Sequence, residues 1–189
     1  MLRMAVMTAF NVAWRTRRGQ TTHRDAYDLF GEPPTRLVLA RLGAAPEAFY
    51  DRHQALAHAG TAPRISLRAL SPEAFLCVAL NASALILTCA AAEEVLHYFR
   101  FADATLKPLS DQPGPLAFSP GDTYIALSPG ARRVVDSADD VRHVVARFLH
   151  MRDDFNAEKL ADALLDHLME MAGVDELPED ITALVIEAR

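Results

Sequence analysis

The stretch that constrains the fold most is residues 178–186, at the C-terminal end of the sequence. Two acids, Glu179 and Asp180, stand immediately before a β-branched and apolar run at residues 181–186. A run of this composition predicts a strand. An acidic pair at the entrance of a strand can supply oxygen ligands to a hard cation, and it can equally form a solvated turn. Partner acids elsewhere in the chain decide between these two interpretations.

The rest of the sequence contains further strand and helix patterns. Strand-forming residues predict strands at residues 4–16, 26–30, 36–40, 85–90, 94–101, 104–108 and 122–127. Apolar periodicity and capping residues predict helices at residues 46–59, 71–80, 138–150 and 157–172, and a loop at 108–120. Asn156 and Gly173 are the expected caps of the last helix.

The order of these elements is strands, two helices, strands, two helices and a final strand. This grouping predicts an α+β fold, whereas a doubly wound sheet would alternate strand and helix regularly. We expect a four-layer α-β-β-α sandwich of two mainly antiparallel sheets, with the first and last strands as neighbours. The 189 residues suffice for a sizeable core and no linker divides them, so one domain over residues 1–189 is expected.

Composition excludes several classes of function. The net charge of −6 argues against a general surface for nucleic acid or anionic membranes. The cysteines, Cys77 and Cys89, stand in apolar surroundings without zinc-site spacing, which favours reduced thiols. The apolar run at residues 4–7 is too short for a signal peptide, and no segment is long enough to span a bilayer. We therefore expect a cytoplasmic protein that binds neither nucleic acid nor a membrane.

Four segments carry a family resemblance, in the same order across nearly the whole chain. They are Thr16-Arg17-Arg18-Gly19 leading to Arg24-Asp25-Ala26-Tyr27, residues 37–48, residues 120–130, and Glu179-Asp180-Ile181-Thr182. Together they resemble the metal-dependent protein phosphatases of the protein phosphatase 2C type. In length the chain is most similar to the bacterial branch that includes the sporulation stage II E-like phosphatases. The resemblance implies the α-β-β-α sandwich, and a site where acids bind two Mg²⁺ or Mn²⁺ ions that activate a water.

The chain departs from this family at the metal-binding positions. Ala40-Arg41 stands where the family has Asp-Gly, and Pro129 stands where it has the aspartate of Ser-Asp-Gly. Glu179 replaces the last metal-binding aspartate, so only Asp25 matches an acid outright. Alanine and proline side chains cannot act as ligands, and the charge of Arg41 would repel a divalent cation. The resemblance therefore implies a pseudophosphatase, with no catalytic residue, no bound metal and no cofactor.

The remaining site candidates each have two interpretations. Asp25, Glu179 and Asp180 could be residual cation ligands, or they could be turn acids that favour solvent. Arg41 could bind a phosphate group, since a guanidinium matches phosphate bidentately, or it could be a surface or ion-paired arginine, and we expect its side chain to be exposed. Ser128 lacks the His/Asp arrangement of a nucleophile. The histidines of the expected helices, His143, His150 and His167, are assigned no role.

Three hypotheses for function follow. The leading one is a catalytically inactive phosphatase-like domain that binds a protein partner, such as a phosphoprotein or a Ser/Thr kinase, in phosphorylation or stress-response signalling. The alternative is a divergent metal-dependent protein Ser/Thr phosphatase that uses Asp25, Glu179 and Asp180 in an altered metal site. The third is a structural or oligomerisation module, and the apolar stripe of residues 157–172 leaves a homodimer open.

Overall fold

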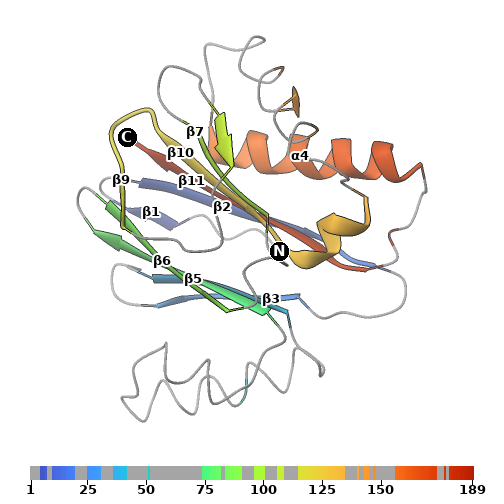
Figure 1. Cartoon of the computed structure of the whole chain (residues 1–189), viewed down its shortest axis with the longest axis horizontal. Coiled ribbons are helices and arrows are strands. Elements are labelled where there is room, and N and C mark those ends of the chain that lie inside the picture. Colours follow the sequence, from blue (N-terminus) through green and yellow to red (C-terminus); the bar gives the residue numbers. More distant parts are fainter. Residues whose placement is uncertain are drawn as a thin grey trace.

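Two antiparallel sheets face each other in the computed structural model (Figure 1). The structure describes residues 5–7, 10–19, 25–30, 36–41, 51, 74–81, 84–90, 96–100, 106–108, 115–134, 140, 143–144, 147, 156–173, 177 and 179–189. The 6-stranded sheet has the order β1 (Ala5–Met7), β2 (Phe10–Arg17), β11 (Ile181–Ala188), β10 (Thr123–Leu127), β7 (Leu96–Arg100) and β8 (Leu106–Pro108). The 5-stranded sheet has the order β3 (Asp25–Phe30), β4 (Arg36–Arg41), β5 (Ala74–Asn81), β6 (Ala84–Ala90) and β9 (Pro115–Ala117).

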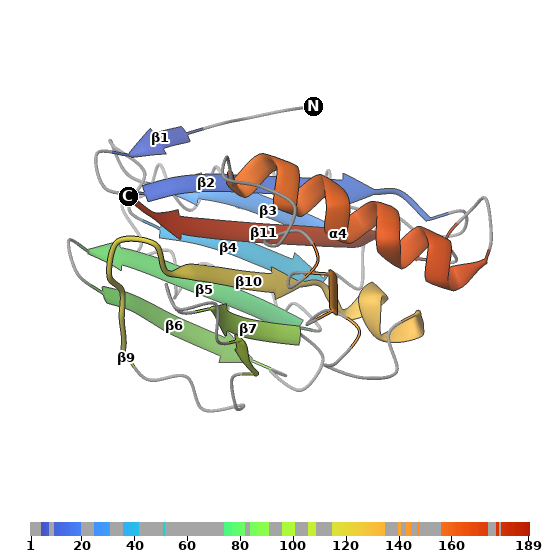
Figure 2. The ribbon, with the colours of Figure 1, turned by 90° about the horizontal axis from the view of Figure 1, so that it is seen from above.

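Helix α4 (Ala157–Ala172) covers the outer face of the 6-stranded sheet, along β2 and β11 (Figures 1 and 2). It begins as the sequence predicts, because the Asn156 side chain accepts a hydrogen bond of 2.8 Å from the Lys159 amide. It ends at Gly173, whose φ of 61° is a left-handed conformation that glycine adopts without strain. Its apolar stripe is buried against the sheet at Leu160, Ala161, Leu164, Leu165 and Leu168.

The last strand is apolar along its length because both of its faces are covered. Leu184 and Ile186 point between the two sheets, where they join the core that includes Trp14. Ala183 and Val185, which alternate with them, belong to the cluster under α4. A continuous apolar run is the expected pattern for a strand that is buried on both faces. Strand β11 pairs with β10 on one side and with β2 on the other, which confirms that the first and last predicted strands lie side by side.

Several predicted elements need correction. The single strand expected at residues 4–16 is two strands, since β1 and β2 pair with each other. The helix expected at residues 71–80 is wrong over its described part, which is β5. Leu76, Val78 and Leu80 are all buried, and this spacing of two residues matches one face of a strand. Strand β9 interrupts the expected loop at 108–120, and the 3₁₀ helix η2 (Pro129–Arg133) was not predicted.

The remaining predictions fare better. The strands expected at residues 26–30, 36–40, 85–90, 94–101, 104–108 and 122–127 correspond to β3, β4, β6, β7, β8 and β10. The antiparallel sandwich confirms the predicted fold class. The helices expected at 46–59 and 138–150 fall mainly outside the described residues. Within the described part of the chain, no helix is long and apolar enough to cross a membrane.

Candidate functional site

Three acids and one arginine from different parts of the chain meet at one end of the sandwich. Asp25 is the first residue of β3, and Arg41, the last residue of β4, lies directly opposite it in the strand register. Glu179 and Asp180 immediately precede β11. Helix η2 and the start of β11 lie at this same end (Figure 2). We call these four residues the acid–arginine cluster; they are the four residual candidates that the sequence suggested.

Asp25 is held by hydroxyl groups of the other sheet. Its side chain is buried, and its carboxylate accepts a hydrogen bond of 2.9 Å from the Thr182 hydroxyl. Thr182 in turn lies 3.0 Å from the Thr16 hydroxyl. Since Thr182 has one hydroxyl proton and gives it to Asp25, Thr16 is the donor in that second contact. The two threonines and Asp25 therefore form a chain of hydrogen bonds that is buried at Asp25 and Thr182 and partly buried at Thr16.

The environment of Asp25 raises its pKa from 3.8 to about 6. Burial is the largest cause, because it penalises the charged form, and the nearby charge of Asp180 raises the pKa further. Hydrogen bonds from Ser128 and Thr182 and the charge of Arg41 act in the opposite direction. Asp25 therefore titrates closer to neutral pH than an ordinary aspartate.

The Asp180 side chain is buried and accepts hydrogen bonds from backbone amides. The interpretation of Asp180 as a turn acid that favours solvent is therefore corrected. The carboxylate accepts a hydrogen bond of 2.9 Å from the Gly19 amide and a long one of 3.4 Å from the Asp25 amide. Two glycines allow other backbone segments to lie this close to the Glu179–Asp180 backbone. A Cβ on Gly19 would lie 2.4 Å from the Glu179 carbonyl carbon, and a Cβ on Gly130 would lie 2.0 Å from the Asp180 carbonyl oxygen.

Arg41 and Glu179 form an ion pair of 2.8 Å. Their side chains are only 15% and 20% exposed. The expectation of an exposed Arg41 is therefore wrong, because the ion pair holds the guanidinium against the acids. A partly buried arginine–carboxylate contact of this length is a charge-assisted hydrogen bond.

The side chains of this cluster do not fit a pair of divalent cations. Asp180 binds backbone amides, Asp25 binds hydroxyl groups, and Glu179 binds a guanidinium. Ala40 is buried in β4 and Pro129 begins η2, and neither side chain has a ligand atom. In the described part of the chain, no group of three or more His, Cys, Asp or Glu side chains is arranged to hold a metal ion.

The hydroxyl residues around Asp25 are part of this site although no sequence pattern assigned them to it, and Ser128 was considered only as a nucleophile. Thr16 and Thr182 lie directly opposite each other in the β2–β11 register, and Ser128 follows β10. The Ser128 hydroxyl accepts a hydrogen bond of 2.9 Å from the Thr182 amide. Their contact with Asp25 depends on the packing of one sheet on the other, which no local pattern reveals. For Thr182 alone the sequence offered an indication of its place, because it lies two residues after Asp180.

Comparison with known proteins identifies the fold. No protein-family model matches the chain, and no curated protein matches it either. Among solved structures, PppA of Pseudomonas aeruginosa, a regulatory component of a T6SS, has a TM-score of 0.66 and 16% identity over 96% of this chain and 99% of PppA. RsbX, solved with magnesium, has a TM-score of 0.64 and 10% identity over the whole of both chains.

A further similar structure is the serine/threonine phosphatase PstP of Mycobacterium tuberculosis. Its TM-score is 0.63, with 15% identity over 95% of this chain and 98% of PstP. The PP2C phosphatase domain of SpoIIE is also similar, with a TM-score of 0.65 and 10% identity over 96% of this chain and 65% of that one. These similarities extend over nearly the whole chain and include both of its antiparallel sheets. The chain therefore has the fold of the PP2C-type phosphatases.

Proposed function

We propose that this chain is a catalytically inactive PP2C-like domain that acts by binding a protein partner. The observation that carries the proposal is the ion pair of Arg41 with Glu179, beside a buried Asp25 and a buried Asp180. Each acid of the cluster has a partner within the protein: Glu179 pairs with a guanidinium, Asp180 accepts hydrogen bonds from backbone amides, and Asp25 accepts one from a hydroxyl group. Acids that are held by such partners depend less on metal ions to offset their charge.

The chemistry of the similar proteins supports this proposal by contrast. The catalytic domain of PstP was solved with two manganese ions, and RsbX with magnesium. Divalent cations in such enzymes generate a nucleophilic water and neutralise charge on phosphoryl oxygens. Arg41 can offer positive charge, but it cannot lower the pKa of a bound water as a divalent cation does. Within the acid–arginine cluster, Arg41 therefore does not replace a metal ion in the nucleophile-forming step.

The proposed partner is a phosphoprotein or a Ser/Thr kinase, and the proposed setting is cytoplasmic signalling. PppA is described as a regulatory component, which fits a role in control. Fold alone does not establish function, so the partner needs a direct test. Capture from phosphorylated and from dephosphorylated lysate, by wild type and by the Arg41→Ala variant, gives that test. Equal capture in all four arms would favour a scaffold that ignores phosphate.

An activity assay tests the proposed inactivity. Purified protein is incubated with a phosphothreonine peptide and with a phenyl phosphate ester, in millimolar Mn²⁺ or Mg²⁺, beside an active metal-dependent phosphatase. We expect no turnover above the buffer rate. Mn²⁺-dependent turnover that disappears in the Glu179→Ala variant would overturn the proposal.

One observation favours a second candidate, a divergent metal-dependent protein Ser/Thr phosphatase with an altered site. The pKa of Asp25 is raised to about 6, and raised carboxyl pKa values are frequent where an acid exchanges protons near neutral pH. This candidate predicts a rate that depends on a group of that pKa and on added metal. Loss of the rate in the Asp25→Asn variant would support it.

A further inference from the structure

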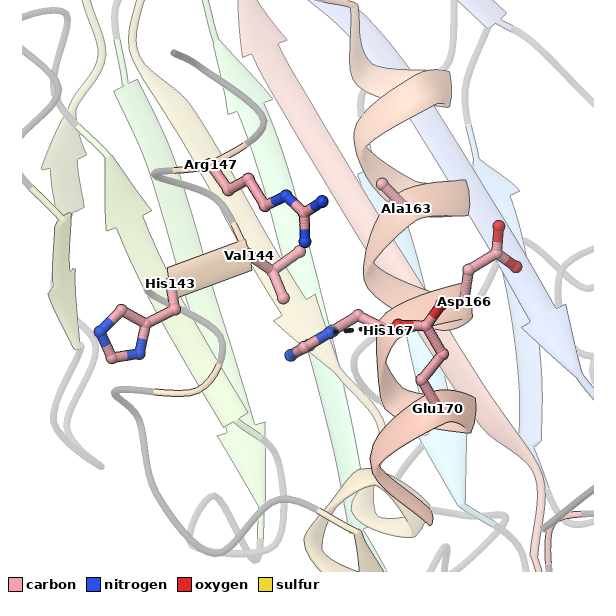
Figure 3. Close-up of a pocket in the computed structure, with 7 residues that line it drawn as sticks. All are labelled: His143, Val144, Arg147, Ala163, Asp166, His167 and Glu170. Carbon is pink, nitrogen blue, oxygen red and sulfur yellow. Dashed lines mark ion pairs between the residues drawn. The ribbon is translucent and has the colours of Figure 1, made fainter. Parts of the chain in front are cut away.

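A hollow of about 420 Å³ lies beside α4 in the outer helical layer (Figure 3). Its lining residues are His143, Val144, Arg147, Ala163, Asp166, His167 and Glu170. None of these residues belongs to the acid–arginine cluster. The volume falls within the range of small-molecule sites, roughly 300–1,000 Å³. We call this feature the α4 hollow.

The two walls of the α4 hollow come from helical residues at regular spacing. His143, Val144 and Arg147 are helical residues of one wall, with His143 and Arg147 four positions apart, and Figure 3 shows the His143 ring turned away from α4. Ala163 and His167 are also four apart, on the facing side of α4. Figure 3 shows the Arg147 side chain extending over Val144 in the direction of α4. Between these walls, buried Val144 and half-buried Ala163 supply an apolar floor.

The charged side chains around the α4 hollow differ in whether they have an ion-pair partner among the described residues. Asp166 pairs with Arg17 of β2 at 2.9 Å, and Figure 3 shows its carboxylate turned away from Arg147. His167 lies 3.9 Å from Glu170. Arg147 is exposed and makes no hydrogen bond or ion pair with any residue that the structure describes. Among the described lining residues, Arg147 is therefore the cationic group that no described partner compensates.

We propose that the α4 hollow binds a small organic carboxylate with an apolar body. The carboxylate pairs with the guanidinium fork of Arg147, which matches its geometry bidentately. A ring N–H of His167 can donate a hydrogen bond to the same group even when the imidazole is neutral. The apolar body rests on Val144 and Ala163. Glu170 at the rim disfavours a dianion such as a phosphate monoester, so one negative charge fits better than two.

The test uses 4-phenylbutyrate as the probe and its uncharged amide, 4-phenylbutyramide, as the matched control. Both are titrated into the ¹⁵N-labelled full chain and followed by amide chemical shifts. We expect the acid to shift α4 signals between Ala163 and Glu170, and to bind more tightly than the amide. The Arg147→Ala variant should lower the affinity for the acid about tenfold or more, because it removes charge-assisted hydrogen bonds. The Arg132→Ala variant removes another exposed arginine and should leave the affinity unchanged.

A second variant separates loss of charge from loss of space. Ala163→Leu fills the hollow without changing charge, on a helix that leucine suits well, and should abolish the α4 shifts with either compound. The Glu170→Gln variant should strengthen binding of the acid. The proposal is overturned if the acid and the amide bind equally. It is also overturned if Arg147→Ala and Arg132→Ala behave alike, or if the shifts fall outside the α4 hollow.

Discussion

The hydroxyl of Thr182 donates a hydrogen bond of 2.9 Å to the carboxylate of Asp25, and this contact joins the two sheets of the sandwich. Thr182 belongs to β11 and Asp25 to β3, so 157 positions of sequence separate them. The carboxylate is buried and its pKa is raised to about 6. An ionised Asp25 therefore costs stability at neutral pH, and its protonation state links the stability of the fold to pH.

The first prediction concerns this linkage. Because the folded state holds the Asp25 proton up to about pH 6, and the unfolded state only to about 3.8, the free energy of unfolding should fall as pH rises through this window. The Asp25→Asn variant should lack this fall and be more stable at pH 7 by about 1–3 kcal/mol. Urea unfolding of wild type and Asp25→Asn between pH 4 and 7.5 measures this free energy of unfolding. The exposed Asp166→Asn variant is the control, and an unchanged pH profile in Asp25→Asn would contradict the prediction.

The second prediction concerns the threonine chain. The Thr182→Val variant keeps the shape of the side chain but removes the donor to Asp25, so it should cost about 1–3 kcal/mol at pH 7. It should also raise the pKa of Asp25 further. Thr16→Val removes only the outer hydroxyl and should cost less. Urea unfolding, together with a carboxyl NMR titration of Asp25, checks both effects. Equal costs for the two variants would argue against the direction of the hydrogen bonds described above.

The third prediction concerns the close approach at Gly19. The Gly19→Ala variant would place a Cβ 2.4 Å from the Glu179 backbone, so the segment that carries Asp180 must shift. We expect a loss of about 1–3 kcal/mol, as overpacking typically gives, and a changed pKa of Asp25. Gly173→Ala is the matched control, because its Cβ meets nothing within 4 Å. It should strain the end of α4, where φ is 61°, and leave the Asp25 titration untouched.

Local patterns predicted the elements whose signals are complete within a short stretch. The apolar run before the C-terminus became β11, and the capped stripe of residues 157–172 became α4. The pattern failed at residues 71–80, where a helix-start signal precedes apolar residues that alternate as in a strand. There the sheet neighbours decide the conformation: β6 follows β5 as its hairpin partner, and β4 lies more than thirty positions earlier in the sequence.

The site residues were found through the family resemblance, but their contacts were not. The Arg41–Glu179 ion pair joins residues 138 positions apart, so nothing in either local sequence indicates it. The hydrogen bond from the Gly19 amide to the Asp180 side chain is equally absent from the local sequence. This contact makes Asp180 a buried residue, where the sequence suggested a solvated turn. Residue type could suggest which groups matter, whereas sheet packing determined which groups meet.

The fourth prediction follows from the partly buried ion pair. The Arg41→Ala variant leaves Glu179 without its guanidinium and removes a positive charge that lowers the pKa of Asp25. We expect a loss of about 1–2 kcal/mol at pH 7 and a further rise in the pKa of Asp25. Arg132→Ala, at an exposed arginine of η2, should change stability by less than about 0.5 kcal/mol. If urea unfolding gave Arg41→Ala and Arg132→Ala the same small change in the free energy of unfolding, the ion pair would contribute nothing to stability.

The last prediction asks whether the departures from the family explain the loss of metal binding. Ala40 lies opposite Ala26 and Arg41 lies opposite Asp25, so changes at residues 40 and 41 act beside the one matching acid. The combined Ala40→Asp, Arg41→Gly and Pro129→Asp variant adds two carboxylates and removes the guanidinium. We expect it to gain Mn²⁺ binding in calorimetry and in Mn²⁺ paramagnetic resonance. Each single change should do nothing measurable, because a cation held by one or two carboxylates keeps most of its water and binds weakly. Adding Asp25→Asn to the combined variant should reverse the gain. Strong Mn²⁺ binding by wild type, or by Arg41→Gly alone, would show that the departures at Ala40 and Pro129 do not prevent it.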